Sequence, residues 1–204
     1  MITIIDYGIG NIGSVKNMLK KVGQKSLITS NLEEIEAAEK LILPGVGAFD
    51  YGMEQLSKHN LIDTLNKKVL IQKTPILGIC LGMQLFSKKS EEGQKNGLGW
   101  IDAVTKKFDF RNNENLAIPH MGWNDIHIKK QCKLTQDLPN DSRFYFVHSY
   151  HMECINKEDV LATSNYGYEF TCSIEKDNIL GVQFHPEKSH KFGMQLLKNF
   201  AEHY

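Results

Sequence analysis

A cysteine flanked by two glycines is the first feature of this sequence that could carry out chemistry. Cys80 follows the apolar run 76–79, which is typical of a buried strand, and precedes 81–86, which is typical of a helix start. With Gly78 and Gly82 it forms the G-x-nucleophile-x-G spacing of a strand-turn-helix elbow. The helix start would point backbone N–H groups at the sulfur and favour the reactive thiolate. The simpler alternative is that Cys80 is a small buried apolar residue.

A base for such a nucleophile occurs near the end of the chain. His185, Pro186 and Glu187 follow the apolar run 179–184, which predicts a last strand. The proline restricts the turn, so the Glu187 carboxylate can bond one ring nitrogen of His185 and leave the other free as a base. The order Cys80, His185, Glu187 therefore predicts a triad, although a single histidine can equally be a surface or packing residue.

Two glycine-rich loops follow predicted strands in the first quarter of the chain. In the first loop, Gly8, Gly10 and Gly13 form the G-x-G-x-x-G pattern of dinucleotide-binding proteins. The second predicted strand, 26–29, is however followed by Ser30 and Asn31, where the acidic residue that binds the ribose should stand. We therefore favour a tight strand-to-helix crossing, or a surface for a partner, over a nucleotide site.

The second loop, 44–49, follows the predicted strand 40–43. Ligands of open parallel sheets bind at the carboxyl ends of strands, where this loop should lie. Gly45 and Gly47 flank Val46, and their mobile backbone could turn an N–H group toward an anion. An ordinary connection between strand and helix is the alternative.

The order of the expected elements indicates an α/β fold. Strands and helices alternate up to about residue 97, which predicts a parallel sheet with helices on both faces. The second half is rich in short strands and closes with an amphipathic helix at 189–204. We expect one domain over residues 1–204, with an open, mixed, mainly parallel central sheet and a smaller antiparallel sheet in the second half. The strands expected in that half are 100–110, 125–129, 143–147, 150–154, 160–165, 169–174 and 179–184.

The overall composition excludes several classes of function. The 204 residues include 24 Lys and Arg and 24 Asp and Glu, so the net charge is zero and nucleic-acid or membrane-surface binding is not expected. The four cysteines form no C-x-x-C pair, which predicts no zinc or other metal site and no disulfide framework. The N-terminus lacks the features of a signal peptide, and no apolar run is long enough to span a membrane. We expect a cytoplasmic protein.

Sequence blocks in both halves of the chain match one known family. Segments 78–84 and 184–187, which contain Cys80 and the pair His185 and Glu187, resemble the class I, triad-type glutamine amidotransferases. Further blocks resemble the branch of this family whose members supply ammonia to a (β/α)8-barrel cyclase in histidine biosynthesis; these are 44–49, 119–124 and 145–150. The blocks stand in family order, and the resemblance spans essentially the whole chain.

The resemblance implies a flavodoxin-like fold and a glutaminase that needs no cofactor. Cys80 would form a thioester with glutamine, His185 would transfer protons, and Glu187 would orient His185. Backbone N–H groups of Leu81 and of Val46 or Gly47 would stabilise the oxyanion. The residues implied in glutamine binding are Gly45, Gly47, Gln84, Ser149 and Tyr150.

The same resemblance implies a heterodimer with the barrel cyclase. Asn11, Trp123 and Lys188 are expected at the interface, Lys188 through an ion pair. A peptide rotation in the loop 45–47 would complete or break the oxyanion hole, so glutaminase activity is expected to be low without the partner.

The sequence leaves three alternatives open. The same glutaminase could serve a barrel synthase that builds acetamidino groups on bacterial sugars. The chain could be a non-enzymatic nucleotide-binding module that uses Gly8, Gly10 and Gly13. It could also be a cysteine hydrolase or peptidase of similar fold.

Overall fold

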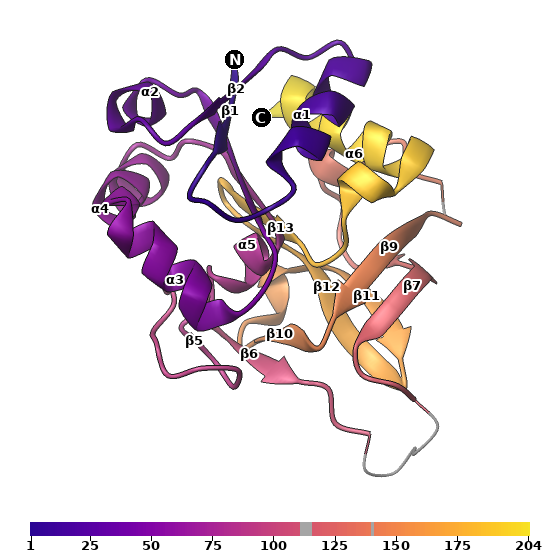
Figure 1. The fold of residues 1–204 in the computed structure, drawn as a ribbon. Coiled ribbons are helices and arrows are strands. Elements are labelled where there is room, and N and C mark those ends of the chain that lie inside the picture. Colours follow the sequence, from indigo (N-terminus) through magenta and orange to yellow (C-terminus); the bar gives the residue numbers. More distant parts are fainter. Residues whose placement is uncertain (111–115, 140) are drawn as a thin grey trace.

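The structure is a computed structural model that describes residues 1–110, 116–139 and 141–204. Its main feature is one large mixed sheet (Figure 1), in the order β2-β1-β3-β4-β13-β12-β10-β6-β5. The first five strands in this order are parallel, which confirms the parallel sheet predicted from the first half. They are β2 (Ser26–Thr29), β1 (Ile2–Ile5), β3 (Lys40–Gly45), β4 (Ile76–Cys80) and β13 (Ile179–Val182).

Apart from the short β5, the rest of the main sheet comes from the second half and is largely antiparallel, as predicted. Its strands are β12 (Tyr168–Lys176), β10 (Tyr150–Cys154), β6 (Ala103–Lys107) and β5 (Lys89–Ser90), with β11 (Val160–Tyr166) and β8 (His127–Ile128) attached through β12. A separate antiparallel pair is formed by β7 (His120–Asp125) and β9 (Arg143–His148).

Helices cover both faces of the parallel strands, which confirms the predicted fold class. The longer helices α1 (Ile12–Lys21) and α6 (His190–His203) lie together on one face, and α3 (Phe49–Lys58) covers the other with the elements between it and β4 (Figure 1). Neighbouring residues of β3 serve opposite faces: Ile42 joins the core under α1 and α6, and Leu43 joins the core under α3. The shorter helices are α2 (Leu32–Glu36), α4 (Leu61–Asn66), α5 (Leu81–Gln84) and the 3-10 turns Lys133–Thr135, Lys157–Asp159 and Pro186–Lys188.

Some element boundaries differ from the sequence predictions. The sequence pattern of 61–70 predicts one helix, but the structure has α4 up to Asn66 and then a π-helix over Lys67–Ile71. The strand expected over 125–129 is observed only as the short β8, and the sequence did not predict β7 before it, which pairs along its whole length with β9, from His120 opposite His148 to Asp125 opposite Arg143. Gly122, Asn124 and Asp125 have low β propensity. Pairing with β9, rather than the local sequence, therefore determines that this segment is a strand.

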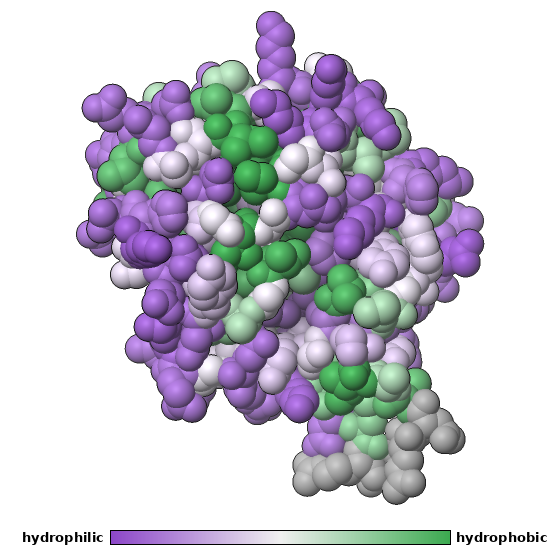
Figure 2. All heavy atoms as spheres, viewed as in Figure 1, coloured by the Kyte–Doolittle hydropathy of each residue, from purple (hydrophilic) through white to green (hydrophobic). Residues whose placement is uncertain are grey.

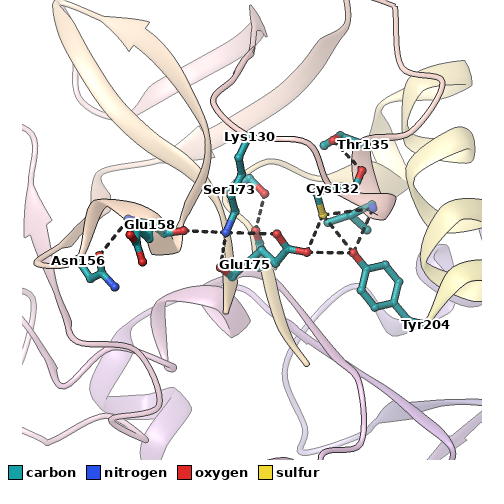
Figure 3. A network of polar contacts seen from close by, with 10 residues as sticks. Lys130, Cys132, Thr135, Asn156, Glu158, Ser173, Glu175 and Tyr204 are labelled. Atoms are coloured by element: carbon teal, nitrogen blue, oxygen red, sulfur yellow. Dashed lines mark hydrogen bonds and ion pairs between the residues drawn. The ribbon is translucent and has the colours of Figure 1, made fainter. Parts of the chain in front are cut away.

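A polar cluster fixes the C-terminus to the sheet (Figure 3). The Cys132 thiol donates to Oε1 of Glu175 at 2.9 Å, and the Tyr204 hydroxyl lies 3.4 Å from the same oxygen. Lys130 forms an ion pair with Glu175 at 3.2 Å. The cluster therefore joins α6, β12 and the segment after β8, and it occupies Cys132 in a structural role.

None of the helices in the described part of the chain is long and apolar enough to cross a membrane.

Candidate active site

Three adjacent strands place the residues predicted to carry out the chemistry at one edge of the sheet. Parallel pairing places Gly45 at the end of β3 opposite Cys80 at the end of β4. On the other side of β4, Val182 of β13 stands opposite Ile79, so the chain that follows β13 emerges beside Cys80. The carboxyl ends of parallel strands lie at the same edge, and this topology brings the loop after Gly45, Cys80 and His185 together.

The backbone of Cys80 has the strained geometry of a nucleophile elbow. Its φ of 55° and ψ of −112° lie in a region that non-glycine residues rarely adopt. A Cβ on Gly78 would lie 2.6 Å from the Phe86 ring, and a Cβ on Gly82 would overlap the carbonyl oxygen of Leu43. Gly78 is thus required by the close packing of β4 on the segment that begins with α5, and Gly82 by the close packing of α5 on β3.

His185 and Glu187 form a buried ion pair. Nδ1 of His185 lies 2.8 Å from Oε1 of Glu187, and the two side chains are only 2% and 1% exposed. Burial disfavours the imidazolium, but the neighbouring Cys80 side chain and the Glu187 carboxylate outweigh it and raise the pKa of His185 to about 10. Nε2 of His185 forms no hydrogen bond within the described part of the chain, so this nitrogen remains available to a reactant.

The backbone around His185 is held by β9. The His185 N–H donates to the carbonyl oxygen of Tyr145 at 2.9 Å, and the Ser189 hydroxyl donates to the carbonyl oxygen of His185 at 2.6 Å. The same hydroxyl accepts the N–H of Tyr145 at 3.0 Å. The imidazole therefore stands on a backbone that two neighbouring elements fix, in addition to the carboxylate that fixes its ring.

A cavity of about 450 Å³ opens in front of Cys80 and His185. Of its lining residues, only Glu92 lies outside the segments that the sequence singles out. Gly45 is one residue outside the lining, and Glu187 lies behind His185. The lining residues are Val46, Gly47, Ala48, Cys80, Leu81, Gln84, Glu92, Pro119, Val147, His148, Ser149, Tyr150 and His185.

Glu92 is the carboxylate that sequence reasoning missed. Its Oε2 accepts the N–H of Phe49, at the start of α3, at 2.8 Å. The loop around Glu92 is held to α3, because the Asp50 carboxylate accepts the N–H groups of Gln94 and Lys95. No local pattern marks Glu92 in the sequence, since its position in the cavity depends on this contact between a polar loop and a distant helix.

The first glycine-rich loop supports the end of β3. A Cβ on Gly10 would lie 3.0 to 3.2 Å from atoms of Pro44, and the φ of Gly10 is 107°. Gly13 has open space around its Cα, whereas the third glycine of a dinucleotide fingerprint serves close packing of helix on strand. The geometry favours the strand-to-helix crossing that we preferred over a nucleotide site.

The residues expected at a partner interface lie outside the cavity. Trp123 is 46% exposed and stacks on His190 with ring centroids 5.5 Å apart. The Lys188 amine lies 5.3 Å from the centroid of the Tyr145 ring and forms no ion pair in the part of the chain that the structure describes. Asn11 precedes α1 without capping it through its side chain. Among the described residues, no group of three His, Cys, Asp or Glu side chains could hold a metal ion.

Comparison with known proteins defines the class. The family "Glutamine amidotransferase class-I" matches residues 3–204. The chain is 57% identical to "Imidazole glycerol phosphate synthase subunit HisH 2" of Methanococcus maripaludis and 52% identical to the protein of the same name from Pseudomonas aeruginosa, with 99% of each chain covered in both cases.

Solved structures agree on the fold. The structure of PurLQS from Thermotoga maritima has a TM-score of 0.72 at 17% identity and covers 98% of this chain and 96% of its own. The glutaminase domain of Trypanosoma brucei CTPS has a TM-score of 0.66 at 16% identity, covering 98% of this chain and 93% of its own.

The chain therefore belongs to the class I glutamine amidotransferase family, which the elbow and the His–Glu pair also indicate. Its relatives of 43 to 57% identity place it, within that family, among the HisH subunits of imidazole glycerol phosphate synthase.

Proposed function

We propose that this chain, as one glutamine amidotransferase domain, hydrolyses glutamine to glutamate and ammonia and passes the ammonia to a (β/α)8-barrel cyclase in histidine biosynthesis. The observation that carries the proposal is the convergence of Cys80, at a strained elbow, with the buried pair His185 and Glu187 at one cavity. The names of the relatives support the pathway, and we propose a cytoplasmic location for the protein.

Cys80 and His185 divide the chemistry between them. The sulfur attacks the side-chain amide carbon of glutamine, and the tetrahedral intermediate collapses as His185 protonates the departing nitrogen. Ammonia leaves, and Cys80 retains the glutamyl group as a thioester. His185 then takes a proton from water, and the hydroxide attacks the thioester carbon. The bond between this carbon and the sulfur breaks, which releases glutamate and regenerates the Cys80 thiolate. Glu187 stabilises the imidazolium that each half-reaction needs and fixes the ring orientation.

Backbone N–H groups supply the oxyanion site. The Leu81 N–H lies at the start of α5, directly after Cys80, where the helix dipole is positive. Val46 and Gly47 lie across the cavity on the loop after β3, and the φ of Gly47 is 95°, a conformation that glycine tolerates without strain. Each such donor is typically worth about 3–4 kcal/mol of transition-state stabilisation. Rotation of the peptide between Val46 and Gly47 would therefore switch the activity.

Glu92 and Gln84 are suited to the α-ammonium group of glutamine. Oε2 of Glu92 accepts the Phe49 N–H, which leaves Oε1 for a cationic ligand. Both donors of the Gln84 amide are used, on the Tyr150 carbonyl at 3.0 Å and on Oε1 of Gln183 at 2.9 Å. Gln84 would thus contact glutamine through its oxygen. Ser149 and Tyr150 would hold glutamine largely through their backbone.

A partner protein is needed to use the ammonia. Ammonia released into water at neutral pH becomes ammonium, which is a poor nucleophile, so it must reach its acceptor without being released. Around the cavity edge and β7, large apolar side chains are exposed: Val46 by 43%, Met121 by 62% and Trp123 by 46%. Figure 2 shows apolar side chains gathered near the middle of an otherwise mostly hydrophilic face. Exposed apolar side chains near the cavity fit a surface that a second chain covers.

Trapping the thioester tests the proposal. The complex with a barrel cyclase is incubated with isotopically labelled glutamine, quenched in acid and digested, and the peptide that contains Cys80 is analysed by mass spectrometry. We expect a glutamyl adduct on Cys80 and none in a Cys80→Ala variant. An adduct on another residue would contradict the mechanism. Co-purification with a barrel synthase for acetamidino sugars instead of the cyclase would retain the glutaminase and overturn the histidine pathway.

A further inference from the structure

A hydrogen-bond chain runs from β7 to the catalytic cysteine, and its two histidines are not used by the mechanism above. Nδ2 of Asn124 donates to Nε2 of His120 at 3.2 Å, and Nδ1 of His120 lies 3.0 Å from Nε2 of His148. Nδ1 of His148 donates to the carbonyl oxygen of Tyr150 at 2.8 Å. His120 and His148 are both buried.

The chain continues on the other side of the Tyr150 carbonyl. That oxygen also accepts Nε2 of Gln84 at 3.0 Å, and the same amide donates to Oε1 of Gln183 at 2.9 Å. Nε2 of Gln183 lies 3.7 Å from the Cys80 sulfur. The Tyr150 backbone, at the cavity wall, and the nucleophile are thus joined through one network of buried amides and imidazoles.

The hydrogen-bond partners determine which nitrogen of each ring carries the proton. The Tyr150 carbonyl can only accept, so Nδ1 of His148 must carry the proton, and Nε2 of the neutral ring must accept. His120 must then donate from Nδ1 and accept from Asn124 at Nε2. Nδ2 of Asn124 also donates to the carbonyl of Asn165 at 2.8 Å, which fixes the orientation of that amide. Every described polar atom of the two rings has a partner when both histidines are neutral Nδ1–H tautomers.

We infer that His148 and His120 are positioning residues of the glutaminase: they hold the Tyr150 carbonyl, and with it the Ser149 and Tyr150 backbone, in the geometry that binds glutamine. The inference rests on the proposed function. His148 lines the cavity, but its hydrogen-bonding nitrogens face protein groups, so it acts through the Tyr150 backbone rather than on the reacting atoms. The burial of both rings agrees with neutral imidazoles, because burial lowers the pKa of His148 to about 3 and of His120 to about 4.

Substitutions at His148 separate positioning from packing. We expect His148→Phe, which keeps a ring but removes the donor, to raise the KM for glutamine at least about tenfold while kcat of the cyclase complex changes by less than about threefold. His148→Asn, whose amide can donate at the position of Nδ1, should recover most of the loss. The matched control is His127→Phe, at an exposed histidine of β8 that is not in the network. Unchanged KM in His148→Phe, or a loss confined to kcat, would overturn the inference.

A measurement on the unaltered protein keeps the inference testable if His148→Phe does not fold. Nitrogen-15 NMR of the imidazoles at neutral pH should show both His120 and His148 protonated at Nδ1 and unprotonated at Nε2. A proton on Nε2 of either ring would overturn the inferred chain. If the wild-type complex forms no glutamate from glutamine, the proposed function itself fails; an active wild type with an equally active His148→Phe overturns only the positioning role.

Discussion

The Cys80 sulfur differs from the other three sulfurs in its surroundings. Burial raises the pKa of Cys132 to about 11, that of Cys154 to about 12 and that of Cys172 further still, so these groups are unreactive thiols near neutral pH. Cys80 instead faces a cavity beside an imidazole that is protonated at neutral pH.

This difference predicts selective alkylation. At about pH 7, iodoacetamide should modify Cys80 at least about tenfold faster than any other cysteine of the folded protein. Peptide mapping by mass spectrometry after short reaction times measures the four rates. In urea, where the surroundings are lost, the four rates should converge. Faster modification of Cys132 in the folded protein would contradict the description of the site.

Glu92 provides a second test at the residue scale. Removal of its charge in Glu92→Gln should raise the KM for glutamine by about ten- to a hundredfold with kcat little changed, because the ion pair to the α-ammonium group is present in both the ground state and the transition state. Glu54→Gln, on an exposed position of α3, is the matched control. Equal KM values in both variants would remove Glu92 from the binding site.

The triad could be predicted from the sequence, whereas Glu92 and His148 could not. Each triad residue occurs in a local sequence pattern that has a physical reason. Cys80 lies in a turn that needs glycine, and His185 and Glu187 lie in a turn that proline restricts. Glu92 reaches the cavity through a contact with the start of α3, and His148 acts through pairing of β7 with β9. Such positions depend on tertiary contacts that a single sequence does not encode locally.

At the scale of elements, the packing of α5 on β3 and β4 determines the site. The alternation of strand and helix predicted these elements correctly, because buried parallel strands leave unmistakable apolar runs. The strand β7 was not predicted, since its pairing with β9 overrides local propensity, whereas the helix start at Leu81 was predicted.

Gly82→Ala tests the crossing. The added Cβ would overlap the Leu43 carbonyl oxygen, so β3 and α5 must separate, and we expect the free energy of unfolding to fall by about 3 kcal/mol. Gly13→Ala is the matched control: its Cβ meets no atom within 4 Å, and alanine should stabilise α1 by up to about 1 kcal/mol. Urea unfolding monitored by circular dichroism measures both. A Gly82→Ala protein as stable as the wild type would contradict the close contact.

The buried histidines of β7 and β9 predict an acid-sensitive fold. The folded-state pKa values of His120 and His148, about 4 and about 3, lie below the ordinary value of 6.5, so the unfolded chain binds more protons in acid. Their contribution to stability is therefore complete above pH 6.5 and is lost as the pH falls toward those values. Each should contribute a slope of about 1.4 kcal/mol per pH unit between these limits.

Urea unfolding across this range measures the slope. The double variant His120→Phe, His148→Phe should lose stability less steeply in acid than the wild type, while His127→Phe, at an exposed histidine, should follow the wild type. The same slope in all three proteins would show that the buried rings do not titrate on unfolding.

At the scale of the whole molecule, the site is suited to act within a complex. Val46 and Gly47 are both part of the cavity wall and part of the exposed surface, and apolar side chains of β7 are also exposed. A partner that covers this surface can bias the loop and receive the ammonia. The coupling free energy of such systems is typically about 1–3 kcal/mol, which corresponds to roughly 5- to 150-fold in affinity.

The central claim is that Cys80 hydrolyses glutamine for a barrel partner, and the rate of glutamate formation tests it most directly. The rate is measured for the chain alone, with the barrel cyclase, and with the cyclase and its nucleotide ligand, for the wild type and for Cys80→Ala. We expect the rate to rise at least about tenfold in the full complex, and Cys80→Ala to lower it at least about a thousandfold. Full activity of the isolated chain would contradict control by the partner, and near wild-type activity of Cys80→Ala would contradict the mechanism.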